Sequence, residues 1–183
     1  MNEPDDVGEV TRTEIGTLAD RLLKACARHK ILVATAESCT GGLIIAAMTD
    51  IPGSSSMVDR GFVTYSNEAK MEMLGVRAAT LEAYGAVSSP TAREMAIGAL
   101  ARSHAGIALA VTGIAGPDGG SAEKPVGLVW FGLALKGKPA ITESRTFENN
   151  GRDFIRRETC RHALIMGLRA LDDHVQADGS PRP

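Results

Sequence analysis

A hydroxyl and a thiol stand side by side in a short glycine-rich turn. Ser38 and Cys39 lie between two apolar runs, and Gly41 and Gly42 follow them. This order predicts a strand, a tight turn and the start of a helix. Amide N–H groups at a helix start have no partner within the helix and carry partial positive charge. The turn could therefore bind a phosphate, or stabilise an oxyanion beside a nucleophile.

Ser38 is the first candidate nucleophile, and a serine hydroxyl needs a general base. The four histidines lie on or beside predicted helices, and none follows a glycine-rich turn. Lys70 is the better base, because the dipole at the start of its predicted helix and partial burial would both lower the pKa of its amine. Tyr65, at the end of the preceding predicted strand, could relay a proton or donate to an oxyanion. Lys70 could equally be a solvated helix lysine, and Tyr65 an aromatic packed on the core.

The neighbours of Ser38 allow several roles. Cys39 is a rival nucleophile, because a helix N-terminus lowers the pKa of a thiol, but it could also be a small buried residue. Thr40 is most simply the N-cap of the following helix, and it could contact a phosphate or an oxyanion. Glu37 could orient Lys70, bind a ribose hydroxyl or accept hydrogen bonds from the turn amides. These alternatives stay open at the level of the sequence.

A second glycine-rich loop covers residues 113–120 and could bind an anion or a sugar through its amides. Arg152 and Arg156, near the start of the last predicted helix, could reach a phosphate. In open α/β sheets, ligands collect outside the carboxyl ends of the strands. We therefore expect one pocket where three polar loops follow predicted strands: 36–42, 64–70 and 112–125.

Hydrophobic periodicity and turn signals predict the elements that must position these loops. Helices are predicted over residues 10–30, 42–49, 67–74, 79–84, 90–104 and 152–175. Strands are predicted over residues 31–36, 59–66, 107–112, 126–135 and 141–147. We expect the N-cap of the helix over 67–74 to be Asn67, and that of the helix over 90–104 to be Ser88 or Ser89.

The alternation of helices and strands predicts one α/β domain with a mixed sheet. The sheet should be parallel where helices cross over and antiparallel in the hairpin at 126–147. A chain of 183 residues suits a single domain, which we place at 10–175, with flexible tails at 1–9 and 176–183.

Composition narrows the class of partner. The net charge of −2 argues against binding to a nucleic-acid backbone and favours a small molecule. The three scattered cysteines form no zinc-binding or disulfide pattern, so we expect no metal. The first residues are acidic, unlike a signal peptide, and no apolar run approaches the roughly 20 residues that span a bilayer. These features predict a cytoplasmic protein that does not enter membranes.

Six motifs, taken together and in this order, resemble the CinA C-terminal domain family of nicotinamide mononucleotide (NMN) amidohydrolases. The resemblance covers roughly residues 12–173. The motifs are Ala36-Glu37-Ser38-Cys39-Thr40-Gly41-Gly42, Pro52-Gly53-Ser54-Ser55, Tyr65-Ser66-Asn67 with Lys70, Gly85-Ala86-Val87-Ser88, Thr112-Gly113-Ile114-Ala115-Gly116-Pro117 and Lys124-Pro125-Val126-Gly127.

This resemblance implies a three-layer α/β/α sandwich with a mixed, mostly parallel sheet. It implies hydrolysis of the NMN carboxamide to nicotinate mononucleotide and ammonia, without a metal or cofactor. Ser38 would be the nucleophile, and Tyr65 and Lys70 its activating partners. The expected substrate-binding residues are Glu37, Cys39, Thr40, Gly41, Gly42, Thr112, Gly113, Gly116 and Arg152.

In the mechanism we expect, Ser38 attacks the carboxamide while amides of residues 39–42 hold the oxyanion. The phosphate would bind the 113–120 loop or Arg152. Many relatives carry this domain behind a larger nucleotide-processing domain, and the sequence here resembles the stand-alone form. We expect a homo-oligomer, most simply a homodimer. Two other functions stay open: a nucleotide-binding regulatory module linked to competence or DNA damage, and a different amidase or phosphate-ester hydrolase.

Overall fold

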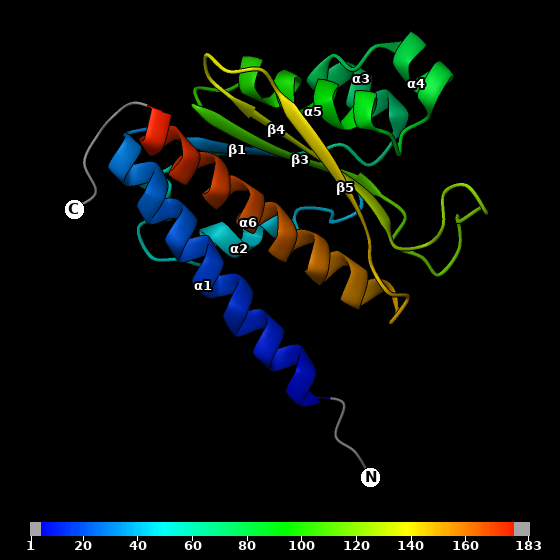
Figure 1. Cartoon of the computed structure of the whole chain (residues 1–183), viewed down its shortest axis with the longest axis horizontal. Helices are drawn as coiled ribbons and strands as arrows, with labels where there is room; N and C mark the ends of the chain where they lie inside the picture. Colours follow the sequence, from blue (N-terminus) through cyan, green and yellow to red (C-terminus); the bar gives the residue numbers. More distant parts are fainter. Residues whose placement is uncertain (1–4, 178–183) are drawn as a thin grey trace.

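Five strands form one mixed sheet in the order β2-β1-β3-β4-β5 (Figure 1). The computed structural model describes residues 5–177, and the side chains of residues 12–172. β1 pairs in parallel with both β2 and β3, whereas β4 runs antiparallel to β3 and β5. The strands are β1 (Val33–Glu37), β2 (Val58–Val63), β3 (Ile107–Gly113), β4 (Leu128–Leu135) and β5 (Ile141–Thr146).

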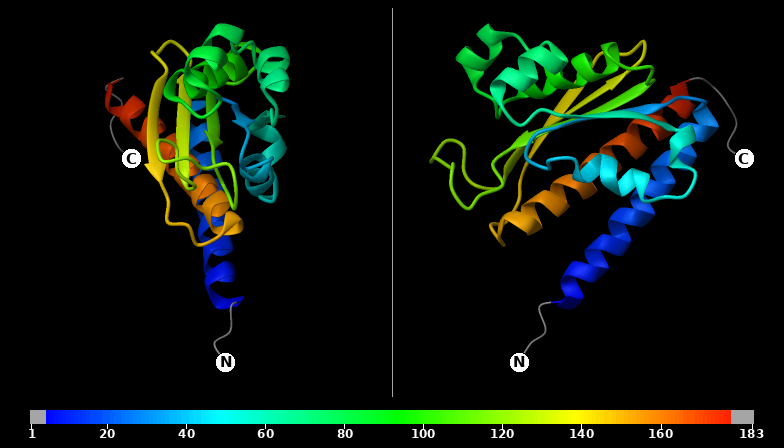
Figure 2. Two further views of the ribbon diagram at one scale, coloured as in Figure 1. Left: turned by 90° about the vertical axis from the view of Figure 1, so that its right-hand side faces the viewer. Right: turned by 180° about the vertical axis from the view of Figure 1, so that it is seen from behind.

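Helices cover both faces of the sheet, which confirms the α/β/α sandwich (Figures 1 and 2). One face carries α1, α2 and α6, and the other carries α3, α4 and α5. Among the described residues, none of the helices is long and apolar enough to cross a bilayer. The helices are α1 (Asp5–His29), α2 (Leu43–Thr49), α3 (Asn67–Leu74), α4 (Ala78–Tyr84), α5 (Ser89–Ala101) and α6 (Arg152–Ala177), with a short 3-10 turn at Ser54–Ser56.

Several helix and strand boundaries in the structure differ from the predicted ones by a few residues. The first helix begins at Asp5 rather than at residue 10, so residues 5–9 are helical and not part of a tail. The last helix continues to Ala177, so residues 176 and 177 are helical, and the remaining parts of the predicted tails, 1–4 and 178–183, lie outside the described residues. β2 ends at Val63, three residues before the predicted end, because the chain then turns into α3.

The two faces of the sheet have different cores. Side chains alternate between the faces of a strand. On β1, Val33 joins the large apolar cluster beneath α1 and α6, whereas Ala34 and Ala36 join a second cluster beneath α5. The second cluster consists largely of alanines, so α5 lies close to the sheet. The fit is so close that a Cβ added to Gly132 would meet the carbonyl oxygen of Ala92 at 2.2 Å.

The carboxyl ends of three parallel strands bring the polar loops together. Glu37 at the end of β1 is paired with Val63 at the end of β2 and with Val111 on β3, which continues for two more residues to Gly113. By alternation, Ser38 and Thr112 point to the same face as Ala36, which is the face of α3 and α5. The loop after β3 projects from this edge of the sheet, beside the start of α6 (Figure 2). The fold thus gathers the predicted site at one edge.

Candidate active site

Ser38 and Lys70, which lie 32 residues apart in the chain, are in hydrogen-bond contact. The distance from Lys70 Nζ to Ser38 Oγ is 3.0 Å. Nζ also donates to the main-chain oxygen of Thr64 at 2.8 Å. The whole Lys70 residue is 1% exposed, so it is not a solvated helix lysine. The geometry of a nucleophile and its base is therefore in place.

The start of α3 brings Lys70 to this position. The cap is Ser66, one residue before the predicted Asn67, and its Oγ accepts from the amide of Ala69 at 3.0 Å. Lys70 lies in the first turn, where the helix dipole disfavours a positive charge. Burial lowers the pKa of the Lys70 amine below its ordinary value of 10.5. An amine with a lowered pKa is more readily neutral, and a neutral amine can accept the proton of Ser38.

Glu37 occupies the N-terminus of α2. It is fully buried, and its carboxylate accepts hydrogen bonds at 2.7–3.1 Å. The partners are the hydroxyls of Thr35 and Thr40 and the amides of Gly42, Ile44 and Ile45. Of the roles open to Glu37 in the sequence, the structure therefore selects contact with the turn amides. It also excludes the N-terminus of α2 as a phosphate cradle, because the protein's own carboxylate fills that position.

The same hydrogen bonds narrow the possible oxyanion donors. The amides of Ser38, Gly41 and Gly42 donate to Val111, Ser38 and Glu37, respectively. Across residues 5–177, no hydrogen bond joins the amide of Cys39 or Thr40 to another residue. The main-chain amides of residues 39–42 were all expected to hold the oxyanion. Two of them, the amides of Cys39 and Thr40, are left as candidate donors.

Glycine is required at two positions of this turn. Gly41 and Gly42 have φ angles of 62° and 100°, in the left-handed region where a side chain is strained. The N-cap of α2 is Gly42 and not Thr40 as predicted, because the Thr40 hydroxyl donates to Glu37 instead.

Cys39 is a poor rival for Ser38. It is 5% exposed, and burial raises the pKa of its thiol to about 12. At neutral pH the side chain is therefore a thiol and not a thiolate, and the thiol is a weak nucleophile. The helix start that was expected to lower this pKa faces Glu37, whose charge acts in the opposite direction.

Tyr65 lies at the mouth of the site. Its side chain is largely solvent-exposed, and its hydroxyl accepts from Arg152 Nη2 at 2.8 Å. Arg152 Nη1 donates to the main-chain oxygen of Gly116 at 2.8 Å. The arginine therefore links the loop after β3 to the segment after β2. Within the described part of the chain, no hydrogen bond joins Tyr65 to Ser38 or Lys70.

A cavity of about 230 Å³ opens above Ser38. It brings together the predicted residues Ser38, Cys39, Tyr65, Lys70, Thr112, Gly113 and Arg152. Glu37, Thr40, Gly41, Gly42 and Gly116 do not line it and act behind its wall. Asn67, Ala86, Val87 and Ala115 also line the cavity and were not predicted as site residues. The signals for them were weak, since Asn67 resembles a helix cap and the other three are small apolar residues.

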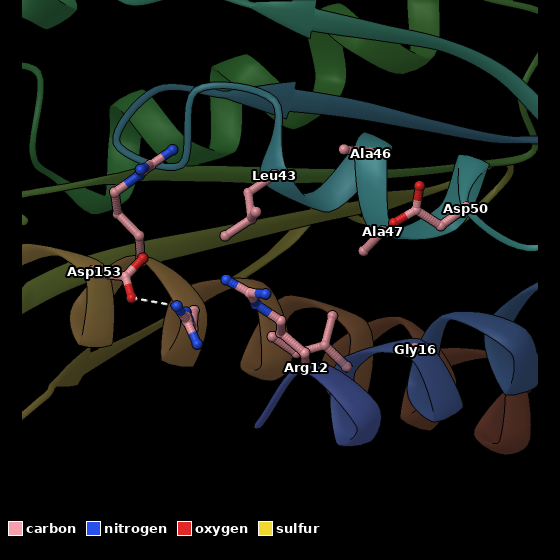
Figure 3. A pocket seen from close by; sticks show the side chains of 10 residues that line it. Arg12, Gly16, Leu43, Ala46, Ala47, Asp50 and Asp153 are labelled. Carbon is pink, nitrogen blue, oxygen red and sulfur yellow. Dashed lines mark ion pairs between the residues drawn. The ribbon is translucent and has the colours of Figure 1, made fainter. Parts of the chain in front are cut away.

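A second hollow of about 310 Å³ lies behind the turn, between α1, α2 and α6 (Figure 3). None of the predicted catalytic residues lines it. Asp153 forms an ion pair there with Arg157. Arg156 also lines this hollow, and its Nη2 donates to the main-chain oxygen of Thr40 at 2.7 Å. The structure therefore places Arg156 as a support of the turn, not as a phosphate ligand in the catalytic cavity.

The described residues contain no cluster of three or more histidine, cysteine or acidic side chains that could hold a metal ion. The cavity does contain a serine, a buried amine and an arginine at its mouth, and the amides of Cys39 and Thr40 directly follow the serine in the chain. Such an arrangement can transfer an acyl group from a small polar substrate to a serine and then to water.

Comparison with known proteins gives one consistent result. The family model described as the CinA C-terminal domain matches residues 15–171. The nicotinamide-nucleotide amidohydrolase PncC of Escherichia coli K12 is 50% identical over 155 residues, which cover 85% of this chain and 93% of that protein. PncC of Enterobacter agglomerans is 56% identical over 137 residues, or 75% of this chain and 83% of the relative.

Solved structures agree with the sequence comparison. The competence/damage inducible protein CihA from Agrobacterium tumefaciens superposes with a TM-score of 0.84 at 53% identity, covering 87% of this chain and 96% of that chain. A CinA superfamily protein from Klebsiella pneumoniae 700603 gives a TM-score of 0.83 at 34% identity, covering 87% and 98%, respectively.

Proposed function

This chain belongs to the CinA C-terminal domain family, and on that basis we propose that it is a nicotinamide-nucleotide amidohydrolase. It hydrolyses the carboxamide of NMN and releases nicotinate mononucleotide and ammonia. Two relatives with this activity in their names share half or more of their aligned residues with the chain. The observation that carries the proposal is the 3.0 Å contact between Ser38 Oγ and the buried Lys70 amine.

The first half of the reaction is acylation of Ser38. Its Oγ forms a bond to the carboxamide carbon, and its proton moves to the neutral amine of Lys70. The carbonyl oxygen becomes an oxyanion between the amides of Cys39 and Thr40, each such donor contributing about 3 kcal/mol. The positive pyridinium ring assists by withdrawing electrons from the carbonyl carbon.

The departure of ammonia completes the acylation, and hydrolysis of the ester then returns the enzyme to its starting state. The bond from carbon to nitrogen breaks, and Lys70 gives its proton to the departing nitrogen, which leaves as ammonia. Water then attacks the ester on Ser38, and Lys70 accepts a proton from that water. The bond to Oγ breaks, Oγ recovers a proton from Lys70, and nicotinate mononucleotide leaves. Lys70 rather than Tyr65 is the proton acceptor, because only Lys70 is hydrogen-bonded to Ser38.

Arg152 and the loop after β3 are the proposed phosphate site. The Arg152 guanidinium lies at the mouth of the cavity and is fixed by Tyr65 and Gly116. A guanidinium held in this way is well suited to bind a phosphate. Thr112 supports the opposite wall, since its hydroxyl donates to the main-chain oxygen of Ala86 at 2.8 Å.

The decisive experiment measures ammonia release from NMN by the wild type and by Ser38→Ala. We expect the variant to lose at least about 10³-fold in kcat while its thermal unfolding is unchanged. Nicotinamide riboside and free nicotinamide should be much poorer substrates, because neither has a phosphate for Arg152. The matched variant Cys39→Ala removes the thiol but keeps the amide, so it should retain turnover.

Three results would contradict the proposal. Full turnover in Ser38→Ala would remove serine from the mechanism, and a Cys39→Ala variant as inactive as Ser38→Ala would move the attack to the thiol. Tight binding of NMN without ammonia release would favour a nucleotide-binding regulatory module instead.

We propose that the enzyme acts in the cytoplasm as a homo-oligomer, most simply a homodimer. Cys26, Cys39 and Cys160 are all unpaired and buried, as expected for a protein kept in a reducing compartment. Closed twofold dimers are the commonest assemblies of soluble proteins. A solution mass equal to that of one 19.2 kDa chain, measured by light scattering, would rule out the dimer.

A further inference from the structure

The hydroxyl of Thr64 is buried and has no hydrogen-bond partner among the described residues. Folded proteins rarely retain such a group, because a buried polar atom without a partner is destabilising. Over the described side chains, the one other buried polar side-chain atom without a partner is Nε of Arg156, which can only donate. Thr64 Oγ1 is therefore an unused buried acceptor, and its position next to the catalytic pair calls for an explanation.

The backbone of Thr64 is held in place from two sides. Its amide donates to the carbonyl of Glu37 at 2.8 Å, and its own carbonyl accepts from Lys70 Nζ at 2.8 Å. Phe62, two residues earlier, packs into the alanine-rich cluster on the α3 and α5 face. Because side chains alternate along an extended chain, the Thr64 side chain points to that same face, from which Lys70 also approaches.

In its protonated form, Lys70 has one more N–H donor than it has acceptors. A lysine ammonium carries three N–H groups. Two acceptors are in contact with Nζ, which are Ser38 Oγ and the Thr64 carbonyl oxygen. At 1% exposure, Lys70 has almost no access to bulk water for the third N–H. An unused donor and an unused acceptor thus belong to two residues that already touch.

Resting on the function proposed above, we propose that Thr64 is a positioning residue for Lys70. When Nζ accepts the Ser38 proton, rotation about the Thr64 Cα–Cβ bond brings Oγ1 to the third N–H of the ammonium. Both oxygens of one residue then hold Nζ, which keeps another N–H aimed at Ser38 Oγ and the departing nitrogen. Thr64 neither gains nor loses a proton, and the proton still passes from Ser38 through Lys70 to ammonia.

The contact favours the protonated form of Lys70. Hydrogen bonds from a charged donor are roughly twice as strong as those from a neutral one. The hydroxyl therefore stabilises the ammonium more than the amine and limits the effect of burial. The nearby titratable or charged groups are Cys39, whose thiol stays protonated, and Glu37 and Arg152 beyond it. Replacing Thr64 leaves these three side chains as they are.

The test compares the wild type with Thr64→Val, which has nearly the same shape without the hydroxyl, and with Thr64→Ser, which keeps the hydroxyl. NMR of protein labelled with ¹³C and ¹⁵N in its lysines follows the titration of Lys70 without any turnover. We expect Thr64→Val to lower the pKa of Lys70 by about 1 relative to the wild type. Thr64→Ser should restore the wild-type value.

A kinetic measurement accompanies the titration. In Thr64→Val, the acidic limb of kcat for ammonia release should move to lower pH by the same amount. The plateau of kcat should fall by about tenfold at unchanged KM, because the ammonium is no longer held in line. Thermal unfolding of Thr64→Val should not fall below that of the wild type, because the substitution removes a buried hydroxyl without a partner.

An unchanged or raised pKa of Lys70 in Thr64→Val would overturn the inference, as would the same lowered pKa in Thr64→Ser. If Thr64→Val does not fold, Thr64→Ala carries the same expectations. A wild-type protein that releases no ammonia, together with the expected NMR difference, would count against the proposed function but not against the contact between Thr64 and Lys70.

Discussion

Lys70 differs from an ordinary surface lysine in its surroundings and not in its chemistry. In water its amine would be almost fully protonated at neutral pH. Here the side chain is buried, and burial disfavours the charged form because no water solvates it. The two polar contacts of Nζ hold the amine against Ser38 while its pKa falls. The loss of solvent thus gives Lys70 the property that the proposed general base needs.

This lowered pKa predicts the pH dependence of the reaction. Lys70 must be neutral to accept the Ser38 proton, so kcat/KM for NMN should rise with pH and level off above the pKa of Lys70. The midpoint should lie below the ordinary lysine value of 10.5. Initial rates of ammonia release between pH 5 and pH 10 measure the profile.

His162 provides the control for that profile. Burial also lowers its pKa, but it packs against Phe131 on the opposite face of the sheet. His162→Gln should therefore leave the midpoint unchanged. If the midpoint of the pH profile shifts in His162→Gln, or if it lies at the ordinary lysine pKa of 10.5, the pH dependence of kcat/KM belongs to a group other than Lys70.

The strand–turn–helix element that carries Ser38 provides its own helix cap. Glu37 at the end of β1 accepts from three amides at the start of α2 and from two hydroxyls. Arg156 of α6 holds the turn from the other side through the carbonyl of Thr40. A buried carboxylate in contact with a helix N-terminus is favourable both as a hydrogen-bond acceptor and as a charge. Within the described part of the chain, the amides of Cys39 and Thr40 are left without a hydrogen bond to another residue, and they are the proposed oxyanion donors.

Glu37→Gln should therefore damage both stability and activity. The amide side chain has a single acceptor oxygen, and its NH₂ group would face N–H donors. We expect a loss of about 2–3 kcal/mol in the free energy of unfolding, measured in urea, and a lower kcat for NMN. Thr35→Val removes one of the five donors and keeps the carboxylate, so it should cost about 1 kcal/mol or less. Equal losses in the two variants would mean that the carboxylate does not organise the turn.

At the scale of the whole molecule, the two layers of helices lie against the sheet in different ways. The layer of α1 and α6 packs through large side chains such as Leu22, Phe131 and Leu164. The layer of α5 packs through alanines, and its main chain comes within 2.2 Å of where a Cβ of Gly132 would be. This close approach brings the α3–α5 layer near the strand ends.

Gly132→Ala tests that spacing. The added methyl group would overlap the Ala92 carbonyl, so α5 must move away from β4. We expect a loss of about 2 kcal/mol in the free energy of unfolding and a reduced kcat for NMN, because α5 supports the layer that buries Lys70. Gly16→Ala is the matched control, since no heavy atom lies within 4 Å of its added Cβ and alanine favours a helix. Similar stability in the two variants would show that the layer tolerates a wider spacing.

The sequence by itself determined the order of the elements and the edge at which the site forms. Hydrophobic periodicity and glycine turns predict every helix and strand to within a few residues, since burial follows the 3.6-residue and 2-residue repeats. The boundaries differ most at the start of α1 and the end of β2, and the caps of α2 and α3 are Gly42 and Ser66 rather than Thr40 and Asn67. Ser38 and Lys70 could also be selected, because their types and places on the elements allow few other partners.

The tertiary structure alone decided which polar groups pair with which. Ser38 meets Lys70, Arg152 meets Tyr65 and Arg156 meets Thr40, and each pair is far apart in the chain. A sequence pattern shows the face on which a side chain lies, but a hydrogen bond depends on distances between elements, and these are set by core packing. For the same reason, the sequence left burial as one of two alternatives at Cys39 and gave no sign of it at Thr64, although burial determines the chemistry of the Cys39 thiol.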